Sequence, residues 1–146
     1  MLIDTHCHLD FPEFDADRDQ VIQRAREQGV QAMVNIGSSL ENSRRSLQLA
    51  SRHDCVYATV GIHPHEADGL NDNQANALAD LLKEKKVVAM GAIGLDYIKN
   101  FSAAKNQRIL FRTLLALAKA NHLPLVIHSR DASQDTIQIL KQAHPV

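Results

Sequence analysis

The stretch LIDTHCHLD (residues 2–10) is a short apolar run that passes into polar residues, with two histidines one residue apart. Side chains alternate across a strand, so His6 and His8 are expected to point to one side and Cys7 to the other. Two converging imidazoles suit a divalent metal, because neutral histidine nitrogen is its commonest protein ligand. The alternative interpretation is a pair of histidines in a loop that binds no metal, and only the rest of the chain distinguishes the two interpretations.

The composition indicates one globular domain. The 146 residues are 45% hydrophobic and 23% charged, with a formal net charge of -1. Without a basic face, binding to nucleic acid would need a local site or a metal. Cys7 and Cys55 have no CxxC spacing, and the sequence shows neither a signal peptide nor an apolar run of membrane-spanning length. We expect a protein of the reducing cytoplasm with no membrane partner.

Short β-rich runs alternate with segments of helical period. Strands are expected at Leu2–Thr5, Ala32–Ile36, Val56–Val60, Val87–Met90 and Leu125–His128. Helices are expected at Asp17–Gln28, Leu40–Arg52, Asn73–Lys86, Ala103–Asn121 and Ser133–Ala143. Five consecutive βα units fit either a doubly wound sheet or part of a (β/α)8 barrel. The first strand is not followed by Gly-x-Gly-x-x-Gly, which disfavours a nucleotide-binding doubly wound sheet.

Histidine or aspartate follows four of the five expected strands: His6 and His8, His63 and His65, Asp96, and His128 with Arg130. A barrel enzyme requires this distribution, because its active residues lie just beyond the carboxyl ends of the strands. His128 is then a candidate third ligand beside His6 and His8, and the forked guanidinium of Arg130 suits a phosphate oxygen. Other interpretations stay open: a core position for His128, loop packing for His63, a capping or orienting role for Asp96, and a surface pair of Arg130 with Asp131.

Four motifs in this order, IDTHCHLDF (3–11), GIHPHEA (61–67), GAIGLDY (91–97) and LPLVIHSRDA (123–132), resemble the TatD family of metal-dependent deoxyribonucleases, which are amidohydrolase-like barrels. The resemblance implies a (β/α)8 barrel, one or two divalent ions (Mg, Mn or Zn) and hydrolysis of phosphodiester bonds in DNA. By position, His6, His8 and His128 match metal ligands of the family, and His63 matches a histidine near the substrate. We expect Asp96 and Arg130 to contact the substrate with His63.

Two departures from the family pattern bear on activity. The second residue of the GAIGLDY motif is usually a glutamate that bridges two metals, and here it is Ala92, whose methyl group cannot ligate. Leu114 stands where a glutamine is usual, which is a smaller change. The sequence also ends after five units, whereas a (β/α)8 barrel takes about 250 residues. The family's ligands after strands six and eight therefore have no positions, so we expect at most one tightly held ion and assign no general base.

The sequence thus predicts a single TatD-like domain over residues 1–146, an α/β fold that is a partial, C-terminally truncated (β/α)8 barrel. The first hypothesis is a metal-dependent hydrolase that cleaves DNA, impaired by Ala92 and the missing units. The alternative is an inactive relative with a structural or assembly role, since open first and fifth strands invite a homo-oligomer. Hydrolysis of a small amide or ester is disfavoured, because no lysine that could bridge two metals stands between Val87 and Ile98.

Overall fold

The computed structural model describes residues 1–69, 71–99 and 101–143. Its sheet has five parallel strands in sequential order. They are β1 (Leu2–Cys7), β2 (Val30–Asn35), β3 (Val56–Val60), β4 (Val87–Asp96) and β5 (Leu125–Arg130). The connecting helices are α1 (Arg18–Glu27), α2 (Leu40–Arg52), α3 (Asp72–Leu81), α4 (Ala104–Ala120) and α5 (Ser133–Ala143). Short 3-10 helices lie at Pro12–Phe14 (η1) and Pro64–Gly69 (η2).

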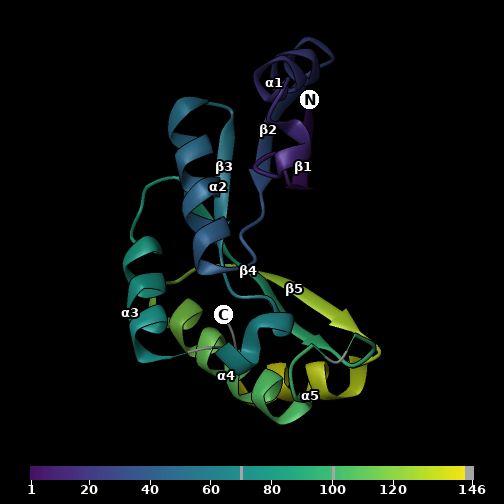
Figure 1. Ribbon diagram of the computed structural model, residues 1–146, viewed down its shortest axis with the longest axis vertical. Helices are drawn as coiled ribbons and strands as arrows, with labels where there is room; N and C mark the ends of the chain where they lie inside the picture. The colour runs from purple at the N-terminus through teal and green to yellow at the C-terminus, as the bar shows by residue number, and fades with distance from the viewer. Residues whose placement is uncertain (70, 100, 144–146) are drawn as a thin grey trace.

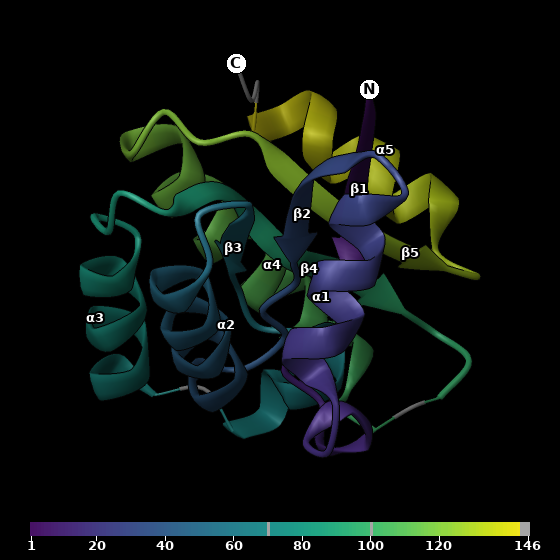
Figure 2. The same ribbon diagram turned by 90° about the horizontal axis from the view of Figure 1, so that it is seen from above.

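The sheet curls into a half-barrel with the helices on its outer side (Figures 1 and 2). The helices lie on one face because the strands follow one another in sequential order, and successive right-handed crossovers then all place their helices on the same face. A doubly wound sheet would reverse its strand order and carry helices on both faces. The predicted partial (β/α)8 architecture is therefore confirmed, and the doubly wound alternative is excluded.

Two apolar clusters fill the space between the sheet and its helices. One packs α1 and α2 against β2 and β3, around Ile22, Met33 and Leu49. The other packs α3, α4 and α5 against β3 and β4, around Leu78, Ile93 and Phe111. The second cluster also buries Leu114, so this departure from the family pattern is an apolar core residue here. Both clusters fix the outer face of the sheet, so the polar residues that follow the strands are carried on a rigid frame.

The central and edge strands differ in burial. Every residue of β4 is buried except Val88, whereas most of β1 is exposed, with Leu2 at 59% and Ile3 at 55%. On β5, Ile127 is 37% exposed. As predicted, β1 and β5 are the edges of the described sheet, and each pairs with a single neighbour.

The main difference from the predicted boundaries concerns β4, which continues past Met90 to Asp96. Gly91 and Gly94 are needed within the strand, because β5 approaches very closely at both positions. A Cβ at Gly94, where φ is +142°, would collide with the carbonyl oxygen of His128. Glycine in a strand commonly marks such a close approach of two backbones.

Cys7 lies partly buried against the cluster around Ile22, and its Sγ is 3.3 Å from the carbonyl oxygen of Val34, so it points away from the histidines as predicted. None of the helices in the described part of the chain is both long and apolar enough to cross a membrane.

Candidate functional site

The carboxyl ends of β1, β3, β4 and β5 carry the polar residues that the sequence singled out. The structure brings four of these side chains into contact: His63 and His65 after β3, Asp96 at the end of β4, and His128 on β5. Parallel strands end at one edge of the sheet, so residues far apart in sequence meet there. His6 and His8 form a separate pair on β1 and just beyond it.

Asp96 is the centre of the larger group. Its side chain is fully buried, and its Oδ2 lies 2.9 Å from Nε2 of His65 and 3.1 Å from Nε2 of His128. Its Oδ1 accepts hydrogen bonds of 3.0 Å from the backbone N–H groups of Ile98 and Lys99. Burial raises the pKa of this carboxyl, but the hydrogen bonds from Lys99, His65, Ile98 and His128 outweigh burial and hold the pKa well below its usual range.

An ionised Asp96 fixes the proton positions on its two partners. A carboxylate can only accept hydrogen bonds, so Nε2 of His65 and of His128 carries a proton. The free lone pair of a neutral ring at either position is then on Nδ1. Asp96 thus orients His128. The sequence left two structural roles open for Asp96, capping a helix or orienting a neighbour, and this is the second of them.

His63 completes this group with a different environment. Its ring lies 4.2 Å from that of His65 and 4.3 Å from that of His128, measured between centroids. Burial, and then the charges of His128 and His65, lower the pKa of His63 to about 4. Its Nδ1 accepts a 3.3 Å hydrogen bond from the backbone N–H of His65, so Nε2 carries the proton of the neutral ring.

The second group consists of His6, His8 and Phe11. The rings of His6 and His8 lie 5.2 Å apart, and Phe11 stacks on His8 at 4.7 Å. Burial, and then the charge of His6, lower the pKa of His8, which favours its neutral form. Nδ1 of His8 is a buried nitrogen with no hydrogen-bond partner of good geometry among the described residues, although the backbone of Ile36 lies close enough to act against the lowering of the ring's pKa.

These residues fit a metal ion in part. The orphaned nitrogen of His8, beside a second imidazole, is the environment of a ligand pair. Within the described ranges, however, no three His, Cys, Asp or Glu side chains are grouped so that they could hold an ion. His128 contacts Asp96 and His63 rather than His6 and His8. The assignment of His6, His8 and His128 as one ligand set therefore stays a prediction.

The remaining predicted residues occupy the same edge. Arg130 is exposed at the end of β5, where its backbone carbonyl accepts a 3.0 Å hydrogen bond from Tyr97, and it forms no ion pair with Asp131. Ala92 lies on β4, and its backbone N–H donates to the carbonyl of Gly37 at 2.6 Å. Ala92 is 7% exposed, so its methyl group is buried, and this position supplies no carboxylate for a metal ion.

The sequence analysis missed a buried side-chain amide that forms hydrogen bonds with the backbone of Asp96. Gln107 on α4 is fully buried; its Oε1 accepts from Asp96 N–H at 2.8 Å, and its Nε2 donates to the carbonyls of Asp96 and Ser102 at 2.9 Å. In the sequence, Gln107 is one polar residue in an amphipathic helix and carries no signal of this role.

The comparison with known proteins identifies the family. The sequence matches the family model described as TatD related DNase over residues 3–146. The chain belongs to this family. Its resemblance to TatD proteins, predicted from four motifs, is confirmed, and the family is one of hydrolases.

Curated relatives are identical to this chain at more than a third of the aligned residues. YabD of Bacillus subtilis, described as an uncharacterized metal-dependent hydrolase, is 37% identical over 142 residues, which cover 97% of this chain and 56% of that protein. The 3'-5' ssDNA/RNA exonuclease TatD of Cronobacter turicensis is 40% identical over 139 residues, which cover 95% and 53%. The chain spans about half the length of these relatives.

Solved TatD structures confirm the fold. The TatD homolog YjjV of Escherichia coli superposes with a TM-score of 0.92 at 36% identity, covering 99% of this chain and 56% of that one. A TatD family hydrolase from Entamoeba histolytica gives a TM-score of 0.91 at 26% identity, covering 98% and 54%.

Proposed function

We propose that this TatD-family chain takes part in the metal-dependent hydrolysis of phosphodiester bonds in DNA. The proposal rests on one observation: His63, His65 and His128 meet around Asp96 at the carboxyl edge of the sheet. The family to which the chain belongs contains nucleases. The free cysteines suit the reducing cytoplasm in which we place the protein.

In this proposal His6, His8 and His128 supply the metal ligands. His8 offers Nδ1, which is buried without a partner, and Asp96 holds His128 with its Nε2 protonated. A divalent cation such as Mg²⁺, Mn²⁺ or Zn²⁺ supplies Lewis-acid activation of water and compensates phosphate charge when bound. One ion at most is held tightly, because Ala92 provides no bridging carboxylate.

The other residues bind the phosphate. Neutral His63 presents a protonated Nε2 as a hydrogen-bond donor, and the exposed Arg130 offers a charged fork at the end of β5. Asp96 has two hydrogen bonds on each carboxylate oxygen, so its contribution to substrate binding runs through the histidines that it orients.

Cleavage of labelled single-stranded DNA and RNA tests this function. The assay compares added Mg²⁺, Mn²⁺ or Zn²⁺ with EDTA, and compares the protein with His8→Ala and Ala92→Glu. We expect metal-dependent cleavage that His8→Ala abolishes and that Ala92→Glu raises. Cleavage that persists in EDTA, or folded protein that never cleaves with any of the ions, would refute the proposal.

The exposed edges of the sheet favour a second candidate, a role in assembly. Leu2 and Ile3 on β1 and Ile127 on β5 leave apolar area on strands with free pairing edges, which a second copy of the chain could cover. Light scattering coupled to gel filtration tests this candidate, since a monomer at high concentration would contradict it.

A further inference from the structure

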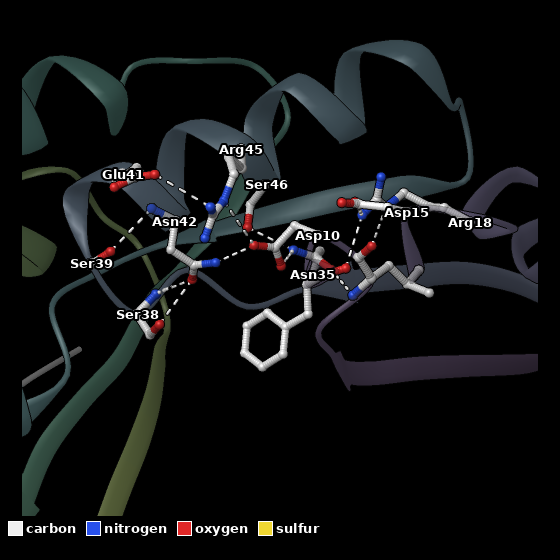
Figure 3. A network of polar contacts seen from close by, with 12 residues as sticks. Asp10, Asp15, Arg18, Asn35, Ser38, Ser39, Glu41, Asn42, Arg45 and Ser46 are labelled. Carbon is white, nitrogen blue, oxygen red and sulfur yellow. Dashed lines mark hydrogen bonds and ion pairs between the residues drawn. The ribbon is translucent and has the colours of Figure 1, made fainter. Parts of the chain in front are cut away.

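Asp10 lies at the centre of a polar network with Asn35 and Asn42, and all three side chains are buried (Figure 3). Its Oδ1 accepts a 2.7 Å hydrogen bond from Nδ2 of Asn35, and its Oδ2 accepts a hydrogen bond from Nδ2 of Asn42. Nε of Arg45 lies 3.7 Å from Oδ2, so the carboxylate also has a nearby positive charge. The side chain of Asp10 is only 2% exposed.

One branch of the network holds the segment that carries His8. Asn35, the last residue of β2, accepts a 2.6 Å hydrogen bond through Oδ1 from the backbone N–H of Leu9. Its Nδ2 donates both to Asp10 and to Oγ of Ser46 on α2. Leu9 and Asp10, the two residues directly after His8, are therefore hydrogen-bonded to Asn35 of β2 and, through its amide, connected to Ser46 of α2.

The other branch leads to His63. Asn42 on α2 accepts through Oδ1 from the backbone N–H of Ser38 at 2.8 Å and from its Oγ at 2.9 Å. The carbonyl of Ser38 in turn accepts a 2.8 Å hydrogen bond from the backbone N–H of His63. The network thus links the ends of three successive strands, β1, β2 and β3.

The energetics of this network depend on complementarity. A carboxylate removed from water is costly unless donors satisfy both of its oxygens, and breaking one partner of a buried network destabilises the rest. Each amide has a fixed orientation here: Asn42 must turn its NH2 group to Asp10, because its oxygen is occupied by Ser38. The backbone N–H groups of Leu9 and Ser38 thus fix how the two amides point, and Asp10 is the acceptor that both NH2 groups then require.

We propose that Asp10 is a positioning residue that sets the placement of His8 and His63 relative to each other through Asn35 and Asn42. Asp10 itself touches no substrate. The consequence for catalysis rests on the proposed nuclease function, whereas the placement of the two rings can be measured without it.

The structure offers a reciprocal exchange as the test. In Asp10→Asn, the introduced amide nitrogen faces the amide nitrogen of Asn42, so two donors oppose each other. In Asn42→Asp, two carboxylates oppose each other. In the double variant, the amide at position 10 donates to the carboxylate at position 42, its oxygen still accepts from Asn35, and the second oxygen at position 42 still accepts from Ser38.

The readouts are the ring signals of 15N-labelled histidines in NMR and Mn²⁺ binding by calorimetry. We expect each single variant to shift the signals of both His8 and His63 and to weaken Mn²⁺ binding at least tenfold, and the double variant to restore at least half of both effects. Asp19→Asn is the matched control, because Asp19 is exposed and its carboxylate pairs with His53, outside the network. It should leave Mn²⁺ binding and the ring signals of His8 and His63 unchanged, while the signals of His53 move.

Two results would overturn the proposal: folded Asp10→Asn protein with unmoved His8 and His63 signals, or a double variant no better than the single ones. If the single variants do not fold, Asn42→Ala removes the link without opposing like groups, and it must still move the His63 signals. If the unmodified protein cleaves no DNA or RNA, the proposed function fails, while the ring signals still decide the role of Asp10.

Discussion

The Gln107→Leu substitution tests how the structure holds Asp96 in place. Leucine has nearly the size of glutamine and suits the apolar surroundings, so the change removes hydrogen bonds while creating little empty space. It takes the acceptor from the Asp96 N–H and the donor from the carbonyls of Asp96 and Ser102. Asp96 and Ser102 are themselves buried at 0% and 3% exposure.

The expected loss of stability follows from these three contacts. Each buried polar group left without its partner costs about 1–3 kcal/mol, and the added apolar surface of leucine returns about 1 kcal/mol. Three such groups less that return give about 2–8 kcal/mol, so we expect the free energy of unfolding to fall by at least about 2 kcal/mol in a urea titration followed by circular dichroism. The amide of Asp96 should also exchange faster with deuterium, because its acceptor is gone.

Arg112→Leu is the matched control, since Arg112 lies on the exposed side of the same helix. It should change the free energy of unfolding by less than about 0.5 kcal/mol. A loss below about 1 kcal/mol for Gln107→Leu, or an unchanged exchange rate at Asp96, would refute the supporting role assigned to this side chain.

Three further predictions concern the sheet, the thiol and acid. Gly94→Ala should unfold the protein or cost more than about 3 kcal/mol in urea titration, because its Cβ would meet the His128 carbonyl; full stability would contradict the close approach. Burial and Asp4 raise the pKa of Cys7 to about 12, so mass spectrometry should show alkylation at pH 8 far slower in folded than in denatured protein. The lowered pKa of Asp96 contributes stability above about pH 4 that is lost as pH falls further, so Asp96→Asn should flatten that decline in acid titration; an unchanged slope would count against it.

Much of the fold followed from local pattern. The predicted bounds of β3, α2 and α5 agree with the structure, because compact apolar runs and capped amphipathic segments are local signals. The end of β4 did not follow, because a glycine suited to a turn is also suited to a strand whose neighbour lies against it. Only the position of the His128 backbone beside Gly94 separates the two cases.

The candidate site divides in the same way. The sequence by itself determined which residues reach the carboxyl edge, since strand alternation and βα order place His6, His63, Asp96 and His128 there. Tertiary structure alone decided their partners: Asp96 binds His65 and His128, and His8 keeps a free nitrogen. The supporting Gln107 and Asp10 were decided there too, because hydrogen-bond direction depends on distances between segments that the order of residues along a chain does not contain.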